Sequence, residues 1–275
     1  QRQMCIRDRV EASGGEVRIG ASIGGVLQRV ELAESSQVNV GAAGGVAGLF
    51  EILGSEATEV RLHGSIDAGG ETGGRIVVEA GDVFVTPLAT LTATGESLGG
   101  SVQVHSSGKT EVAGQIFADA NAGTGGRIEL NALGDLLVLP SARLEATGFN
   151  EGGRVSVASG GDLSFLGRAN VSSNGGTGGQ IQLGGENVLV GVDALLAADG
   201  KQQGGSVRVD ATVDLDFLGK ASASSDSGQG GSIQLTAENV LVGTDALLDA
   251  NGQQGGGTIH IEAVDQLNFL GKATT

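Results

Sequence analysis

Residues 178–205 read GGQIQLGGENVLVGVDALLAADGKQQGG and contain the pattern that decides the fold. Between the two glycine pairs that begin at Gly178 and Gly204, the apolar residues occur in three short bursts. Two of these bursts, Gln180-Ile-Gln-Leu and Asn187-Val-Leu-Val, alternate apolar side chains with others. Alternation with period two indicates a strand with one buried and one exposed face. The stretch therefore predicts three short strands joined by three turns.

The same unit repeats along most of the chain. Glycine pairs begin at Gly73, Gly99, Gly125, Gly152, Gly178, Gly204, Gly230 and Gly256. The interval between successive pairs is nearly constant, and each pair is followed by a short alternating strand such as Ser232-Ile-Gln-Leu. One unit cannot bury its own apolar face, but parallel stacking of successive units buries it. The repeat predicts an all-β, right-handed parallel β-helix of roughly nine or ten coils, with about 26 residues per coil and a length of about 45 Å at about 4.8 Å per coil.

Two types of coil alternate along this β-helix. The stretch 181–196 (IQLGGENVLVGVDALL) recurs two repeats later, at 233–248, as IQLTAENVLVGTDALL. Three phenylalanines and three basic residues share this spacing: Phe165, Phe217 and Phe269, and Arg168, Lys220 and Lys272. We expect the phenylalanines to lie two coils apart in one column of the core. We expect the basic residues to form a line of solvated turn positions that offsets nearby carboxylates, with a ligand-facing stripe as the alternative.

Composition divides the chain into three parts. Residues 1–9 contain the only Cys and the only Met and no Gly, so we expect a non-native or unstructured N-terminal tail. Residues 10–72 keep strand-like segments such as Val60-Arg-Leu but space their glycine pairs more widely than the rest of the chain, which indicates diverged coils. Residues 73–275 hold the regular coils. We expect 10–275 to be one β-helix without polar caps, as in an internal fragment of a longer solenoid.

The overall composition excludes several classes of protein. The 275 residues include 51 Gly but only 2 Pro, too few for collagen, and 39% hydrophobic residues, too many for a disordered chain. No segment approaches the ~18 consecutive apolar residues of a membrane helix, so we expect no membrane span. The formal net charge of −16 repels phosphate backbones and disfavours nucleic acid as a partner.

Residues with catalytic or metal-binding chemistry form no recognisable site. The histidines fall on different predicted coils without partners at metal-ligand spacing: His63, His105 and His260. Asp214 and Asp216 point to one face of a predicted strand, and carboxylate pairs cleave glycosidic bonds. However, the pair is one variant of a repeated surface position. We therefore expect no catalytic, cofactor-binding or metal-binding residue, no cofactor and no enzyme activity, and we assign no binding residue.

Residues 230–261, GGSIQLTAENVLVGTDALLDANGQQGGGTIHI, combine the glycine pairs with the alternating strands in one unit. This unit resembles the repeats of filamentous haemagglutinin-like exoproteins, closely over 73–275 and loosely over 11–72. The resemblance implies a large adhesin of a Gram-negative bacterium, secreted or at the cell surface, and exported by two-partner secretion through an outer-membrane pore. Members of that family also carry Asn-Pro motifs in a secretion cap, and this chain contains no Asn-Pro.

These observations favour a non-enzymatic shaft segment that acts as a rigid spacer or an adhesive surface in cell adhesion or biofilm. Its ligand on a host, a cell surface or a matrix is not defined by the sequence. Two alternatives share the fold. One is the scaffold part of a β-helical polysaccharide-degrading enzyme whose active site lies outside these residues, and the other is an autotransporter passenger.

Overall fold

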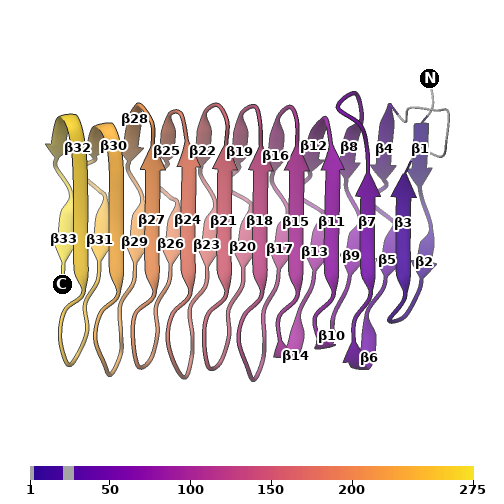
Figure 1. The fold of residues 1–275 in the computed structure, drawn as a ribbon, viewed down its shortest axis with the longest axis horizontal. Coiled ribbons are helices and arrows are strands. Elements are labelled where there is room, and N and C mark those ends of the chain that lie inside the picture. The colour runs from indigo at the N-terminus through magenta and orange to yellow at the C-terminus, as the bar shows by residue number, and fades with distance from the viewer. Residues whose placement is uncertain (1–2, 21–27) are drawn as a thin grey trace.

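Three parallel ladders of short strands run along the molecule in a computed structural model, which describes residues 3–20 and 28–275. The described residues contain no helix. In Figure 1 the chain ascends along the front strands, crosses the top and descends behind while it advances from right to left. This path is a right-handed coil. The structure thus confirms the predicted parallel β-helix of about ten coils.

The first ladder begins each regular coil directly after a glycine pair. Its strands are β3 (Glu16–Gly20), β7 (Leu49–Leu53), β11 (Arg75–Ala80), β15 (Ser101–Ser106), β18 (Arg127–Ala132), β21 (Arg154–Ser159), β24 (Gln180–Gly185), β27 (Ser206–Ala211), β30 (Ser232–Val242) and β32 (Thr258–Phe269). The second ladder consists of β1 (Gln3–Ile6), β4 (Arg29–Leu32), β8 (Glu59–Leu62), β12 (Asp82–Val85), β16 (Thr110–Val112), β19 (Leu136–Val138), β22 (Leu163–Phe165), β25 (Val188–Val190) and β28 (Asp214–Phe217). Because β30 and β32 continue into the second ladder, the two ladders form one 19-stranded sheet.

The third ladder is an 11-stranded sheet. It consists of β2 (Arg9–Glu11), β5 (Gln37–Asn39), β9 (Ser65–Asp67), β13 (Thr90–Thr92), β17 (Gln115–Phe117), β20 (Arg143–Glu145), β23 (Arg168–Asn170), β26 (Leu195–Ala197), β29 (Lys220–Ser222), β31 (Leu247–Asp249) and β33 (Lys272–Thr274). A further three-stranded sheet contains β6 (Ala42–Val46), β10 (Gly70–Thr72) and β14 (Gly95–Leu98), in the connections that lead back to the first ladder.

The N-terminal segment corrects one of the two alternatives expected for residues 1–9, the unstructured tail. Residues 3–9 do not form an unstructured tail, because β1 pairs in parallel with β4. Met4 lies beside Val30 and Ile6 beside Leu32, and Ile6 is half-buried against the core. The physical reason is that the alternation of Met-Cys-Ile matches a half-buried strand, and its backbone satisfies an edge of β4 that is otherwise unpaired. Cys5 points outward as an exposed free thiol.

The predicted phenylalanine column exists and has valine between its members. Phe165 pairs with Val190, which pairs with Phe217, and the series continues through Val242 to Phe269. Phe165 and Phe217 are completely buried. Phe269 differs, with 39% of its surface exposed. It lies on β32, which pairs with β30 on one side only within the described residues.

The buried side chains of the third ladder compensate for the alternation of phenylalanine and valine in the second ladder. The coil that carries Phe165 in the second ladder carries Ala169 in the third, and the next coil combines Val190 with Leu196. All four side chains are buried. On these coils a larger residue therefore shares its coil with a smaller one, so that the two layers are filled to a similar volume. This compensation explains why the sequence alternates between two coil types.

Close backbone contact, and not an unusual backbone conformation, requires the repeated glycine pairs. A Cβ atom on Gly179 would lie 2.1 Å from the carbonyl oxygen of Gly153 on the preceding coil. The described glycines with a positive φ, Gly14 and Gly44, lie outside the pairs of the regular coils. Only a residue without a side chain allows two coils to approach this closely at the corner.

Candidate binding groove

An open groove follows the repeated glycine pairs along the solenoid, beside the first residues of the strands in the first ladder. These strands begin at the lower end of the front face in Figure 1. One stretch of about 510 Å³ runs from Thr124 to Ser206. A second stretch of about 730 Å³ is formed by equivalent positions on the preceding coils, as far as Ser101. Because glycine has no side chain, the floor of the groove is backbone and only the flanking residues form walls.

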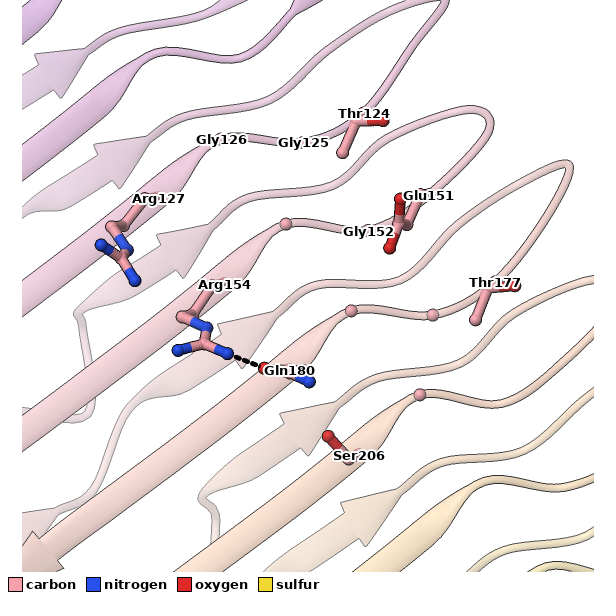
Figure 2. A pocket seen from close by; sticks show the side chains of 14 residues that line it. Thr124, Gly125, Gly126, Arg127, Glu151, Gly152, Arg154, Thr177, Gln180 and Ser206 are labelled. Atoms are coloured by element: carbon pink, nitrogen blue, oxygen red, sulfur yellow. Dashed lines mark hydrogen bonds between the residues drawn. The ribbon is translucent and has the colours of Figure 1, made fainter.

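The walls of the groove are two rows of side chains in register. One row consists of the first residues of strands in the first ladder: Arg75, Ser101, Arg127, Arg154, Gln180 and Ser206. The other row consists of the residues before the glycine pairs: Thr72, Leu98, Thr124, Glu151 and Thr177. Figure 2 shows the second row across the glycines from the arginines. Arg127 pairs with Arg154 in the first ladder. The backbone of Glu151 forms isolated parallel β-bridges with Thr124 and Thr177. Each coil therefore adds one residue to each wall.

The arginines carry charge that the protein does not neutralise locally. Arg127 and Arg154 are both exposed and lie on the adjacent strands β18 and β21. Arg154 donates a hydrogen bond from Nη2 to Oε1 of Gln180, as Figure 2 shows. Among the described residues, no carboxylate lies within ion-pair distance of either guanidinium group. Glu151 is the carboxylate on this stretch of the opposite wall.

Arginines of the second ladder, by contrast, are neutralised by carboxylates. Arg61 donates from Nε to Oε1 of Glu59 at 2.6 Å, and Arg29 approaches the same oxygen through Nη2 at 2.7 Å. The hydrogen bond from Arg61 lowers the pKa of Glu59 below the usual carboxyl range, and Arg29 adds to this effect. The two guanidinium groups share this one carboxylate, and the contact stabilises the surface of the first coils.

The floor of the groove carries carbonyl oxygens without a backbone donor. The N–H of Gly126 donates to the carbonyl of Ala118 at 2.6 Å, and the carbonyl of Gly126 accepts from the N–H of Arg154 at 2.9 Å. No described N–H donates to the carbonyl of Gly125. Since C=O and N–H of a trans peptide unit point in opposite directions, the Gly125 carbonyl points away from Ala118. Water or a ligand normally satisfies such an acceptor.

The candidate catalytic residues remain dispersed. The three histidines lie on different coils, as predicted. His105 lies 3.3 Å from the amide nitrogen of Asn131 through Nδ1, and His260 Nε2 lies 3.6 Å from a carboxylate oxygen of Glu262. Within residues 3–20 and 28–275, no group of three or more His, Cys, Asp or Glu side chains is placed to hold a metal ion.

The carboxylates Asp214 and Asp216 occupy a repeated surface position, as the sequence predicts. Both are exposed on β28. Asn239 on the next coil donates a hydrogen bond to Oδ1 of Asp214 at 2.9 Å, and Asn187 donates to Asp162 in the same way at 2.8 Å. The recurrence of this contact two coils apart assigns Asp214 a role in joining adjacent coils.

The line of basic residues lies on the third ladder, away from the groove. Arg168, Lys220 and Lys272 begin β23, β29 and β33 and are exposed, and Leu195 lies between the first two in the ladder. The expected exposure to solvent is therefore confirmed, but the expected turn positions are wrong, because all three residues begin strands. The expected neutralisation is not confirmed, because none of the three lies within ion-pair distance of a carboxylate in the described part of the chain.

The groove and its arginines are the features that the sequence analysis missed. A signal for them is present, because Arg75, Arg127 and Arg154 each follow a glycine pair directly. In the alternating pattern, the first residue of each strand is simply one of the outward positions. That the buried and half-buried glycine pairs form the floor of a groove depends on how successive coils stack, which a linear sequence does not display.

Comparison of the chain with protein-family models, with curated proteins and with solved structures returns no match. The resemblance to filamentous haemagglutinin-like repeats therefore rests on the repeat residues alone. In the described parts of the chain, no helix has the length and hydrophobicity needed to cross a membrane.

Proposed function

We propose that this chain is a shaft segment of a secreted or surface-exposed bacterial exoprotein of the filamentous haemagglutinin type, which acts as a rigid spacer or an adhesive surface and catalyses no reaction. The observation that carries the proposal is the continuous register of the ladders. The first ladder pairs strand after strand from β3 to β32, and the described residues between these strands contain no inserted domain. A continuous rod holds whatever lies at its two ends at a fixed separation.

Backbone pairing supplies the stiffness that a spacer requires. Neighbouring coils are joined in three ladders, and the corners add further bonds, such as Arg154 N to Gly126 O at 2.9 Å. Bending the rod would open these bonds on one side and compress the buried columns on the other. The outward residues are not needed for packing, so they are free to vary and to form a contact surface.

The surface charge suits a rod that stays separate from its copies. The net charge of −16 gives neighbouring rods a mutual repulsion that is strongest at low ionic strength. We therefore expect isolated rods, and not lateral bundles, on electron micrographs at low salt. The family resemblance supports export through a dedicated outer-membrane pore, which is the partner that we propose during secretion.

Localisation in the source bacterium tests the proposal. An antibody raised against residues 73–275 is applied to intact cells, to culture medium and to lysates, with and without the gene for the neighbouring outer-membrane pore. We expect signal on intact cells or in the medium that disappears when the pore gene is deleted. Signal found only after lysis would overturn the proposal.

The two alternatives are distinguished at the gene and by one assay. Long-read sequencing of the locus identifies an autotransporter if a membrane barrel follows in the same reading frame, or an enzyme if a catalytic domain does. Incubation of the purified chain with acidic polysaccharides gives no shortening of the polymer under our proposal. Cleavage that persists through purification would favour the enzyme scaffold.

A further inference from the structure

The glycine groove has the form of a track for an extended chain. Its two stretches, of about 510 and 730 Å³, follow one another along the rod and are open to solvent along their length. Each coil contributes the same backbone floor, so a linear polymer parallel to the axis meets an equivalent site about every 4.8 Å. This spacing is close to the length of one extended sugar unit.

The charges on the groove walls favour a ligand that carries carboxylates. Arg127 and Arg154 lie side by side without ion-pair partners, and Glu151 is the carboxylate on the facing wall of this stretch. The guanidinium group binds carboxylates in a planar, two-point geometry and always carries its charge. Two adjacent guanidinium groups, one coil apart, match two carboxylates on neighbouring units of a polymer.

The remaining polar groups favour a ligand rich in hydroxyl groups. The Gly125 carbonyl has no described backbone donor, and its position recurs on every regular coil. The hydroxyl groups of Thr124 and Thr177 line the wall opposite the arginines. Carbonyl oxygens accept from hydroxyl donors, and threonine hydroxyls both donate and accept.

From these three features we propose that the groove between Thr124 and Ser206 binds a linear polyuronate, a polymer of carboxylated sugars. Arg127 and Arg154 hold carboxylates of neighbouring sugar units, while the floor carbonyls and the threonines bind hydroxyl groups. Glu151 opposes the ligand and limits its affinity. This inference rests on the proposed function, because it gives the shaft an adhesive face.

Titration calorimetry with the complete chain tests the inference, with oligogalacturonate of defined length as the probe. The buffer has low salt and contains a chelator, so that divalent cations do not bridge the probe to acidic residues. We expect saturable binding that weakens as salt is added. The double variant Arg127→Gln/Arg154→Gln should lose roughly tenfold or more in affinity, and Glu151→Gln should bind more tightly.

A matched control is available on the third ladder. Arg143 and Arg168 are also neighbours in register but lie on the opposite sheet, away from the groove. The variant Arg143→Gln/Arg168→Gln makes the same change in net charge and should bind the probe like the original chain. Thermal melts followed by circular dichroism confirm that both double variants stay folded.

The inference would be overturned by the absence of oligogalacturonate binding at low salt, by equal binding of neutral cello-oligosaccharides, or by equal loss of affinity in the two double variants. Equal binding of a single-stranded oligonucleotide would replace the polyuronate with a general polyanion and would also overturn it. None of these results affects the antibody localisation. Failure of the binding site is therefore distinguishable from failure of the shaft proposal.

Discussion

Phe165 and Val190 occupy the same interior column on successive coils, paired in register and both completely buried. Phe165 would not tolerate a second phenylalanine one coil away without a change elsewhere, because strands in a ladder are only about 4.8 Å apart. The third ladder compensates with Ala169 and Leu196 on the same two coils. From Phe165 to Phe269 the unit that the solenoid repeats is therefore a pair of coils, and the stability of each of these coils depends on the type of its neighbour.

The column predicts a large effect for removal of a phenylalanine ring. Phe217→Ala should lower the free energy of unfolding by about 3–5 kcal/mol, because the coils on both sides hold the cavity open. Asp216→Ala, one residue away on the exposed face of β28, should change it by less than about 0.5 kcal/mol. Chemical denaturation followed by circular dichroism measures both. Equal effects would show that this column does not pack as described.

Replacement of glycine by alanine usually stabilises a fold where the backbone allows it, but at the corner glycines we expect it to destabilise the fold. Gly205→Ala would place its Cβ 2.2 Å from the carbonyl oxygen of Gly179, and a backbone atom cannot move away cheaply. We expect a loss of more than about 1 kcal/mol. At Gly184 the nearest atom to an added Cβ is 3.9 Å away, so Gly184→Ala should gain about 0.4–1 kcal/mol by reducing the freedom of the unfolded chain.

Thermal unfolding of the two alanine variants provides the test. The midpoint of Gly205→Ala should fall and that of Gly184→Ala should stay the same or rise. If both variants were equally stable, close contact between coils would not be the reason for the glycine pairs, and a groove floor without side chains would be the remaining explanation.

Glu59 predicts a dependence of stability on pH. Its hydrogen bond with Arg61, with Arg29 nearby, lowers its pKa in the folded state. A carboxyl group whose pKa is lowered by folding stabilises the folded state at pH values above its pKa in the unfolded chain. This stabilisation is lost as the pH falls through the pKa that the group has in the folded state. Glu59→Gln should therefore cost up to about 1 kcal/mol at neutral pH, and the cost should disappear in strong acid.

Thermal melts of the original chain and of Glu59→Gln, from neutral pH to strong acid, measure the difference in stability between the two chains. Glu34→Gln removes the same charge at an exposed residue outside this cluster and should show no comparable dependence. A difference between the original chain and Glu59→Gln that stayed constant down to acid would indicate that the ion pairs contribute nothing to the fold.

The sequence predicts the architecture because the architecture is periodic. Spacing between glycine pairs, alternation within strands and the two-coil recurrence of Phe165 and Phe217 each translate directly into stacking. The pairing of Ile6 with Leu32 was not predicted, because a single strand at a composition break has no repeat to identify it. The groove was missed for another reason: its arginines lie a full coil apart in the chain and become neighbours only when β18 pairs with β21.

The pairing of coil types leads to a prediction about deletions. Removing residues 180–231 takes out two coils and joins the coil of Phe165 to one that carries Val242 in the same column. Removing only residues 180–205 takes out a single coil and joins the coils of Phe165 and Phe217. Two rings then compete for one layer of the second ladder, while Ala169 meets Ala221 in the third and leaves a void.

The shorter deletion should therefore be the more damaging one, although it retains more coils. We expect it to cost about 1–3 kcal/mol more than the longer deletion, as overpacking and a cavity act in the same shell. Adding Phe217→Val and Ala221→Leu to the shorter deletion restores a coil of the alternate type and should recover this loss. Denaturation midpoints of the two deletions, and of the shorter deletion with both substitutions, measure these differences. If stability simply followed the number of coils, each coil would be an independent unit and the alternation of coil types would have no energetic role.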